Sequence, residues 1–547
     1  MGAVHLFTLN VCVIDRRTIL KHIALVGGLP VCPRLAVFDD FPPIRRLTRG
    51  PGHHFFGYYD KFQFDDSGRF VLGMRVDFEG RTPRPDDALS LGIIDLEDGD
   101  KWKDIGRSTA WGWQQGCMLQ WRPGHDRQVM WNDREGDRYV CRILDLDGGE
   151  EQTIPYPVYS VAPDGRTAMS LDFRRVQAMR PGYGYVGLPD PHQKDPAPKD
   201  SGIFRVNLED GTRELVLSIA DIAAIEPRTP DMDGASHYVN HLLVSPDGRR
   251  FIFLHRWRPD GGRGHFRTRM FTANLDGTEP HLIESSGRVS HFIWQDARRI
   301  AAWSGPGERP WGFHVYTDQS ERLEPLGEGV LDEDGHISFL PGGEWILSDT
   351  YPDRKERKQR PYLFHVPTNR VVPLGEFHLP PEYTGEWRCD THPRCSRDGT
   401  RIIIDSPHGG DGRQLWLIDV SAIISNSSRK ASMPSIEELA ARQLEAYNQA
   451  DLAAFAAVYH PEVVVFNDNE ESYRGREELR ERYRGMFEHW KFGATVSKRM
   501  SMGPHCIDLE HWWRVNPKTG VRTEGDIMVR YTMRDGLIGW VQFLRPE

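Results

Sequence analysis

A short turn flanked by strand-like residues recurs seven times along the sequence, and no other feature restricts the fold as strongly. Asp-Gly and related pairs supply the positive φ angles that a tight hairpin turn requires. The residues after each turn alternate or run apolar, as buried strands do. Each copy therefore predicts a β-hairpin. The copies are FDDSGRFVL from Phe64, QWRPGHDRQVMW from Gln120, VAPDGRTAMSL from Val161, VSPDGRRFIFL from Val244, WQDARRIAAW from Trp294, LPGGEWILS from Leu340 and SRDGTRIII from Ser396.

A second pair of strand-like segments follows the repeated turn, for example LGIIDLEDGDKW from Leu91 and IFRVNLEDGTREL from Ile203. Two hairpins make a four-stranded blade, and repeats of roughly 50 residues are typical of β-propellers. The sequence therefore predicts an all-β seven-bladed β-propeller over residues 50–425. A β-sandwich or a pair of smaller β domains is the alternative, but neither repeats one turn at this period.

The sequence pattern changes after the propeller. Residues 426–433 form a Ser-rich polar stretch that is typical of a linker. Ser435 and Glu438 then form a capping box at the start of a helix, and a second helix, a strand and a third helix follow. Four long strands finish the chain. Residues 434–547 are thus predicted to be a separate small α+β domain.

The segments EAYNQADLAAFAAVYHPEVVVF and GREELRERYRGMF in this domain resemble the nuclear-transport-factor-2-like, or SnoaL-like, family. The resemblance covers nearly all of residues 434–547 and implies a cone-shaped fold. Because this cone hosts isomerases, cyclases, dehydratases and dimerisation modules, it specifies activity poorly. We interpret the domain as a binding or dimerisation module that could form a homodimer, with catalysis on a small hydrophobic molecule as the alternative. The residues that could face its pocket are Asp468, His489, His511 and Glu524.

Four histidines share nearly the same position relative to the repeated turn in four consecutive blades. His241, His336 and His392 lie five residues before the second position of the turn, and His291 lies four residues before it. This offset falls at the start of the innermost strand, and inner strands line the central channel of a propeller. A single such histidine is usually a hydrogen-bonded core residue. Four at one register predict imidazoles at one end of the channel, because core packing would not select titratable groups repeatedly.

These histidines predict a metal site. Imidazole with a thiolate suits Zn²⁺, whereas imidazole with carboxylate or amide oxygen also suits Mn²⁺. The segment RCDTH places Cys389 and Asp390 close to His392. We therefore expect a divalent metal, Zn or Mn, and His241 remains free to accept a proton. The expected ligands are His291, His336, His392 and Cys389.

The first three blades offer other polar groups near the same end of the channel. GHHFFGYYDK supplies His54 and Tyr59, AWGWQQG supplies Gln115, and MRPGYGY supplies Tyr183. Aromatic and amide groups of this kind stack on sugars and hydrogen-bond to them, so His54, Tyr59 and Gln115 are predicted to bind a substrate. For any one of the aromatic residues, packing between blades is the commoner role.

The propeller resembles the oligogalacturonate lyases and, more loosely, the ulvan lyases. The matching segments are NHLLVSPDGRRFIFLHRW, SHFIW, DGHISF and RCDTHPR, which cover the fourth to seventh blades. The resemblance implies β-elimination on a uronate-containing oligosaccharide or polysaccharide, with His241 as the base. It also implies that His291, His336 and His392 hold the metal. The glutamine ligand expected in that family is missing, and Cys389 is nearest to it in character, which leaves a structural zinc open.

Such an elimination needs defined groups around the sugar. The proton α to a uronate carboxylate is weakly acidic, so a base must act together with a cation that stabilises the enolate. His241 would be that base. Arg256 or Arg205 could pair with the substrate carboxylate. Tyr183 or Tyr185 could protonate the leaving oxygen. The alternative is a non-catalytic TolB-like propeller scaffold with structural zinc and a dimerising or ligand-binding C-terminal domain.

Charge and cysteine content exclude some classes of protein. The formal net charge of −10 disfavours nucleic-acid binding, which requires a basic face. Seven cysteines spread from Cys12 to Cys506 do not resemble a disulfide framework and fit a reducing compartment or a metal site. The sequence has no apolar run of about 18 residues, so no membrane span is predicted.

Residues 1–49 are interpreted as a leader. Arg16 and Arg17, followed by a short apolar run, resemble a twin-arginine export signal. Glycine and proline break that run between Ile23 and Val31, and no small-x-small cleavage site follows clearly. A cytoplasmic location is therefore favoured, with export to the periplasm or the medium as the alternative.

Overall fold

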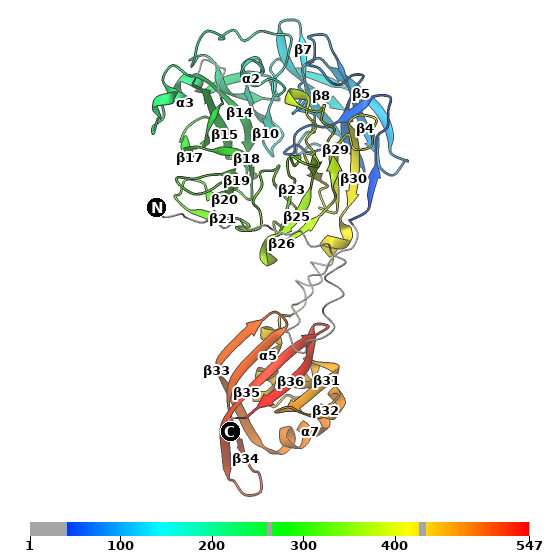
Figure 1. Cartoon of the computed structure of the whole chain (residues 1–547), viewed down its shortest axis with the longest axis vertical. Coiled ribbons are helices and arrows are strands. Elements are labelled where there is room, and N and C mark those ends of the chain that lie inside the picture. The colour runs from blue at the N-terminus through cyan, green and yellow to red at the C-terminus, as the bar shows by residue number, and fades with distance from the viewer. Residues whose placement is uncertain (1–40, 260–264, 426–433, 546–547) are drawn as a thin grey trace, which may run out of the picture.

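The computed structural model describes residues 41–259, 265–425 and 434–545. Within these ranges the chain folds into a β-propeller followed by a small α+β domain, residues 434–545, which we call the cone domain (Figure 1). The predicted fold class is confirmed. The leader motif at Arg16 and Arg17 lies outside the described residues.

The propeller consists of seven four-stranded antiparallel sheets in the described part of the chain. The first six blades add their strands in chain order from the inside outwards, whereas the outermost strand of the seventh is β1. The strands of the first three blades are β2 (His53–Phe55), β3 (Phe70–Val76), β4 (Leu89–Asp95), β5 (Lys101–Ser108), β6 (Gln120–Trp121), β7 (Gln128–Glu135), β8 (Arg138–Asp145), β9 (Glu151–Ile154), β10 (Ser160–Val161), β11 (Thr167–Leu171), β12 (Gly202–Asn207) and β13 (Arg213–Ser218). Those of the fourth and fifth are β14 (Ser236–Val244), β15 (Arg250–Arg258), β16 (Arg267–Asn274), β17 (His281–Gly287), β18 (Val289–Trp294), β19 (Arg299–Ser304), β20 (Gly312–Thr317) and β21 (Leu323–Pro325). Those of the sixth and seventh are β22 (Ser338–Phe339), β23 (Trp345–Ser348), β25 (Tyr362–His365), β26 (Arg370–Pro373), β28 (Arg394–Cys395), β29 (Arg401–Ser406), β30 (Gln414–Asp419) and β1 (Ile44–Arg46), and β24 (Lys358–Gln359) with β27 (Phe377–His378) forms a separate ribbon.

The repeated turn joins the two innermost strands of a blade, as predicted from the sequence. In the third blade Gly165 has φ +65°, and its amide donates to the carbonyl of Ala162 at 2.9 Å. In the fourth blade Gly248 has φ +70° and donates in the same way to Ser245 at 2.9 Å. Glycine adopts this backbone conformation without steric cost, which explains why it recurs at this point of the turn.

The seventh blade is completed by a strand from the other end of the chain. β1 pairs antiparallel with β30, with Ile44 opposite Ile418. Next to it the buried Thr48 hydroxyl donates to Gln414 Oε1 at 2.7 Å. The propeller therefore begins before residue 50, where the repeats had placed its boundary. The repeats could not indicate this strand because its three residues contain no turn.

Large aromatic side chains fill the space between neighbouring blades. Trp111, Trp113 and Trp131 are each at most 2% exposed, and Trp111 meets Trp113 edge to face with ring centroids 5.0 Å apart. They belong to a buried apolar cluster that also contains Phe55 from the first blade and Leu415 from the seventh. Because such contacts tie each blade to the next, they fix the inner strands around the channel.

Two short helices belong to the third blade, α2 (Phe173–Met179) and α3 (Ile219–Ala224). Asp172 caps α2, because its side chain accepts from the amide of Arg174 at 3.0 Å. The segment after α2 carries Arg180 and Tyr183, both of which lie at the site described below. The helix thus positions polar groups that the blade itself does not supply.

The cone domain packs helices against a six-stranded sheet with the order β32-β31-β36-β35-β34-β33. The predicted capping box is present, since the Ser435 amide donates to Glu438 Oε2 at 2.8 Å and the Glu438 amide donates to Ser435 Oγ at 3.1 Å. Buried apolar residues from helices and sheet form a core of their own. Its elements are α5 (Ile436–Asn448), α6 (Leu452–Ala457), β31 (Tyr459–Asn467), β32 (Glu470–Arg474), α7 (Arg476–His489), β33 (Lys491–Met502), β34 (His505–Val515), β35 (Arg522–Arg534) and β36 (Leu537–Leu544).

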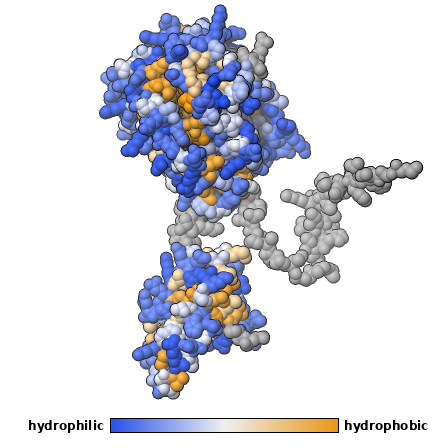
Figure 2. All heavy atoms as spheres, turned by 90° about the vertical axis from the view of Figure 1, so that its left-hand side faces the viewer, coloured by the Kyte–Doolittle hydropathy of each residue, from blue (hydrophilic) through white to orange (hydrophobic). Residues whose placement is uncertain are grey.

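The surface is largely hydrophilic, with apolar patches on both the propeller and the cone domain (Figure 2). Exposed apolar side chains of the cone domain include Met500, Met502 and Val521. None of the helices in the described ranges is both long enough and apolar enough to cross a membrane.

Candidate active site

The four aligned histidines lie where the innermost strands are irregular. His241, with φ +54°, lies at a register shift within β14, and His291 lies at a register shift within β18. His336 and His392 each precede the innermost strand of their blade by two residues, and His392 has φ +38°. A bulge or a left-handed residue takes a side chain out of the normal strand alternation. At His241, His291 and His392 the shared sequence register therefore coincides with a backbone irregularity that redirects the imidazole, whereas His336 lies in the segment just before its strand.

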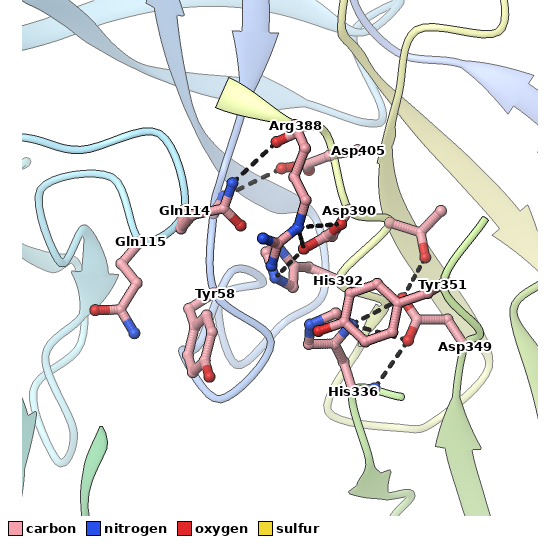
Figure 3. A network of polar contacts seen from close by, with 12 residues as sticks. Tyr58, Gln114, Gln115, His336, Asp349, Tyr351, Arg388, Asp390, His392 and Asp405 are labelled. Atoms are coloured by element: carbon pink, nitrogen blue, oxygen red, sulfur yellow. Dashed lines mark hydrogen bonds and ion pairs between the residues drawn. The ribbon is translucent and has the colours of Figure 1, made fainter. Parts of the chain in front are cut away.

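Three of the imidazoles form one buried cluster together with an aspartate. The ring centroids of His291 and His336 are 4.5 Å apart, and those of His336 and His392 are 4.2 Å apart. The ligand atoms of His336, Asp390 and His392 all lie within 4.8 Å of one another (Figure 3). Each of these three residues is at most 3% exposed. We call His336, Asp390 and His392 the His–Asp group.

Two further carboxylates orient the imidazoles. Asp349 Oδ1 lies 2.9 Å from His336 Nδ1 and accepts from the His336 amide at 2.8 Å (Figure 3). Asp334 Oδ1 lies 2.9 Å from His291 Nδ1. Pairing at Nδ1 leaves Nε2 of each ring as the ligand nitrogen, which is the usual arrangement of histidines that bind metals. Burial opposes the imidazolium, but the Asp349 charge outweighs it and raises the pKa of His336.

Arg388 fixes the position of Asp390. Its Nε lies 3.0 and 2.8 Å from the two carboxylate oxygens of Asp390 (Figure 3), and its Nη2 donates to Tyr183 Oη at 3.1 Å. Burial opposes the guanidinium charge, but Asp390 and then Tyr183 raise the pKa of Arg388 well above its ordinary value. Because 27% of the Arg388 side chain is exposed, a permanent cation lies between the buried His–Asp group and solvent.

The structure places the predicted ligand Cys389 in different surroundings from the His–Asp group. Cys389 is 1% exposed and packs in an apolar cluster with Leu379, Tyr383 and the partly buried Trp387. Burial raises the pKa of its thiol, which disfavours the thiolate that a metal would bind. The donor atoms that the fold brings together are therefore nitrogen and oxygen.

This donor set fits a divalent cation. Two imidazoles and one carboxylate, with His291 beside them, are ligands found in Zn²⁺ sites as well as in sites of other divalent metals, so the cluster fits a divalent cation without selecting one. Burial, and after it the charge of His336, lowers the pKa of His392 well below its ordinary value. His392 is therefore neutral, as a metal ligand must be.

His241 lies beside this cluster with a separate set of partners. Its Nδ1 is 3.2 Å from both Tyr159 Oη and Gln115 Nε2, and its Nε2 is 3.3 Å from Tyr58 Oη. Burial, and after it the charge of Arg180, lowers the pKa of His241 well below its ordinary value. His241 is therefore neutral near pH 7, the form in which an imidazole accepts a proton.

The amide of Gln115 decides which nitrogen of His241 carries the hydrogen. Gln115 Nε2 lies 2.7 Å from Tyr159 Oη, whereas the buried Gln115 Oε1 has no partner among the described residues. If oxygen and nitrogen of this amide exchange places, Oε1 accepts from both the Tyr159 hydroxyl and His241 Nδ1–H. In that orientation His241 Nε2 is left as the acceptor, and the amide nitrogen takes the position that has no partner among the described residues.

Two other residues predicted for substrate contact lie around this site. The Tyr59 ring centroid is 5.4 Å from that of His336, and its hydroxyl donates to the Phe292 carbonyl at 2.7 Å. Arg256 is 2% exposed, and its guanidinium lies 4.6 Å from the Phe266 ring centroid. Its Nε and Nη1 have no hydrogen-bond partner in the described part of the chain.

The predicted proton donor Tyr183 is held by two arginines. Arg180 Nη2 donates to Tyr183 Oη at 3.0 Å, in addition to the bond from Arg388. The Tyr183 ring meets the His241 imidazole edge to face, with ring centroids 5.8 Å apart. Because the Tyr183 oxygen already accepts two bonds, its own hydrogen is available for a third group.

Three residues considered for the site lie elsewhere in the propeller. His54 Nδ1 is 2.9 Å from Gln414 Oε1, at the seam between the first and seventh blades. Arg205 lies in β12, donates to Glu214 at 2.6 Å and is 40% exposed. Tyr185 accepts a bond from Asn132 within a packed aromatic cluster. None of these contacts involves the His–Asp group or His241.

The cone-domain residues that the sequence suggested for a pocket do not line its cavity. His511 is 46% exposed and pairs with Asp526 at 2.8 Å, and Glu524 pairs with Arg522 at 2.7 Å. Successive residues of a strand point to opposite faces, so His511 and its neighbour Glu510 face opposite sides of the sheet. It is Glu510 that lines the cavity. His489 and Asp468 also lie outside that lining.

Fold and site together define a seven-bladed propeller with a buried nitrogen–oxygen cluster, joined to a domain of SnoaL-like type. Residues 440–539 match the family model of the SnoaL-like domain, which confirms the C-terminal resemblance.

The particular structures that resemble the propeller are oligogalacturonate lyases. One is the oligogalacturonate lyase from Vibrio parahaemolyticus, with 15% identity and a TM-score of 0.51, covering 69% of this chain and 94% of that chain. A second is an oligogalacturonate lyase in complex with manganese, with 15% identity and a TM-score of 0.51, covering 69% and 93%. These matches confirm the predicted resemblance in fold, and the looser one to ulvan lyases stays a prediction. None of the curated proteins matches the sequence.

Proposed function

We propose that this protein is a metal-dependent lyase that cleaves uronate-containing oligosaccharides by β-elimination. One observation carries the proposal: a neutral, buried His241 lies in the same channel as a His–Asp group suited to a divalent cation. The fold likeness to oligogalacturonate lyases, one of them a manganese complex, supports it.

The reaction would begin with proton transfer to His241. In β-elimination a base removes the proton on the carbon α to the uronate carboxylate, a C=C bond forms, and the C–O bond to the leaving sugar breaks. If the Gln115 amide is turned so that its oxygen accepts from Nδ1–H, Nε2 of His241 is the atom that receives the proton. The Tyr58 hydroxyl, 3.3 Å from Nε2, would hold the ring in place and would release the single Nε2 lone pair when the substrate proton approaches.

Tyr183 would return a proton to the leaving oxygen. Its oxygen accepts from Arg180 and Arg388, so its hydrogen can be donated. The same two arginines would hold the substrate carboxylate in place of Arg205, whose guanidinium is engaged on the outer part of the blade. His336, His392 and Asp390 would hold the metal, which supplies a positive charge that stabilises the enolate.

The direct test follows the ultraviolet absorbance of an unsaturated uronate product. The metal-loaded protein is incubated with oligosaccharides of different uronic acids and compared with His241→Ala and with Arg205→Gln as a matched surface control. We expect absorbance to rise for the wild type and for Arg205→Gln but not for His241→Ala. Equal rates in all three proteins would contradict the role of His241.

A second candidate function is a ligand-binding scaffold in which the metal has only a structural role. The burial of His336, Asp390 and His392, each at most 3% exposed, favours it. If the protein is such a scaffold, removing the metal should lower its melting temperature, and no uronate substrate should yield an unsaturated product. For the lyase, the product forms, and its formation depends on the metal.

A further inference from the structure

The cone domain contains a cavity of about 560 Å³ that the proposed lyase reaction does not use. It is bounded by α5, α7 and the face of the sheet formed by β34, β35 and β36. Six of its seventeen lining residues are aromatic, which suits a ligand with a flat ring system. The aromatic lining residues are Tyr447, Tyr473, Tyr483, Trp512, Tyr531 and Phe543.

Arg514 brings an uncompensated positive charge to this cavity. Its guanidinium carbon lies 5.2 Å from the Trp512 ring centroid, and its buried Nε has no hydrogen-bond partner among the described residues. It hydrogen-bonds to Tyr447 of the lining but forms no ion pair with a carboxylate of the described chain. The neighbouring Arg482 differs, since Glu478 holds its Nε at 2.8 Å. A guanidinium with an unpaired buried N–H, stacked on a lining residue, is prepared to bind an anion.

Glu510 is the carboxyl group of the cavity lining, and its environment raises its pKa so that it is largely protonated at about pH 6. Burial is the main cause that raises its pKa to about 7, although a bond from Tyr531 opposes this. Tyr531 Oη lies 2.9 Å from Glu510 Oε1 and 3.2 Å from Gln443 Oε1. One phenolic hydrogen cannot serve both oxygens, but a protonated Glu510 can donate to Tyr531 while Tyr531 donates to Gln443. The neutral acid leaves Arg514 without a competing anion.

We propose that the cone domain binds a small aromatic carboxylate, with the ligand's carboxylate on Arg514 and its rings between Trp512 and the other aromatic residues of the lining. This site is separate from the propeller channel and does not depend on the lyase proposal.

Ionisation of Glu510 would weaken this binding, because a second anion in the cavity would repel the ligand and attract Arg514. Asp508 and Arg499, the other charged groups close to Glu510, pair with each other at 2.6 Å. The remaining groups that face Glu510 carry no charge when protonated. They are Tyr459 from β31, Tyr483 from α7, Tyr531 from β35 and, on α5, Tyr447 and Gln443.

The test is isothermal titration calorimetry of the full chain with 2-naphthoate, after a chelator has removed any metal from the propeller. At about pH 6 we expect one saturable site per chain, with 2-naphthamide binding at least about tenfold more weakly because a charge-assisted bond is lost. Arg514→Met should weaken naphthoate binding by at least about tenfold. Arg522→Met is the matched control, because Arg522 also stacks on a tryptophan, Trp513, but lies outside the cavity lining. It should bind like the wild type.

A second variant tests the cavity independently of Arg514. The affinity of the wild type should fall by about threefold or more between about pH 6 and about pH 8, and that of Glu510→Gln should stay constant because the amide cannot ionise. No saturable binding at pH 6, equal weakening in both arginine variants, or an unchanged pH dependence in Glu510→Gln would overturn the proposal. Circular dichroism confirms that each variant is folded before it is titrated.

Discussion

The Tyr58 ring is stacked on the His241 imidazole, with ring centroids 4.9 Å apart and planes inclined by 12°. The Tyr58 hydroxyl lies 3.3 Å from Nε2, and burial, followed by the charge of Tyr59, raises the Tyr58 pKa well above its ordinary value. Tyr58 therefore remains a neutral phenol that orients the proposed proton acceptor by stacking and by a hydrogen bond.

Replacing Tyr58 by Phe should preserve the stacking but remove the hydrogen bond to Nε2. We expect kcat for elimination to fall by about tenfold to a hundredfold with little change in KM, because the acceptor is no longer oriented. Steady-state kinetics measure this. Tyr316→Phe is the control, since the Tyr316 hydroxyl of the fifth blade is also buried but bonds to Glu284 of the fourth blade. A similar loss of kcat in both variants would indicate a general structural effect.

Asp349 should control metal affinity although it is not a ligand of the proposed site. Replacing it by Asn removes the negative charge behind His336 Nδ1, and loss of such a partner typically weakens metal binding by about tenfold to a hundredfold. Cys389→Ala tests the ligand that the sequence suggested, and it should leave affinity unchanged because Cys389 lies in an apolar cluster. Competition with a chromophoric chelator measures the metal affinity of both variants. Weaker binding in the cysteine variant alone would restore the thiolate as a ligand.

Arg388 should be needed for the reaction, and Arg205 should not. Arg388→Gln removes the cation between Asp390 and solvent, and the loss of a charge-assisted bond to substrate corresponds to about tenfold to a hundredfold in kcat/KM. Arg205→Gln changes an exposed ion pair and should leave kcat/KM unchanged. The two kcat/KM values with one uronate substrate decide between these arginines as the carboxylate-binding group.

The closing strand β1 should stabilise the propeller. A chain that begins at Gly50 lacks Ile44–Arg46 and leaves the outer edge of β30 unpaired, so its propeller should melt at a lower temperature than that of a chain beginning at Phe41. Differential scanning calorimetry of both chains tests this. Equal melting temperatures would mean that blade closure by β1 contributes no stability.

The propeller could be predicted from the sequence because each repeated turn is specified by residues that are close together in the chain. The Asp-Gly step at Gly165 or Gly248 specifies its hairpin without help from distant residues. The strand at Ile44 could not be predicted in this way, since three residues become a strand only when β30 lies beside them. The meeting of His336 and His392 could be predicted in a similar way, because they occupy equivalent positions of adjacent blades and such positions meet at the channel.

The partners of these histidines could not be predicted, because they follow no shared register. Asp349 contacts His336 within the sixth blade but also accepts a bond from Thr391, 42 residues further along the chain. Cys389 and Asp390 are adjacent in the sequence, so proximity to His392 could not decide which of them faces the metal site. The chain turns the carboxylate toward His392 and the thiol into an apolar cluster.

Glu510 should make the cone domain less stable as pH rises. Its pKa is about 7 in the folded domain and lies near the ordinary 4.5 in the unfolded chain, so the folded state binds the proton more tightly. Stability is therefore highest below pH 4.5, falls between about pH 4.5 and pH 7, and is constant above that range as far as this group is concerned. The difference corresponds to at most about 3.5 kcal/mol, because each pKa unit is equivalent to about 1.4 kcal/mol.

Replacing Glu510 by Gln should remove this dependence. We expect Glu510→Gln to unfold at a higher temperature than the wild type at about pH 8 and to show little gain at about pH 4, where the wild-type carboxyl is protonated in both states. Scanning calorimetry of the full chain at both values measures the effect. The control is Glu524→Gln on the opposite face of the sheet, where Glu524 pairs with Arg522 near solvent. A gain at both pH values would mean that the amide stabilises the domain by packing, and Glu510 would then not be a buried acid with a raised pKa.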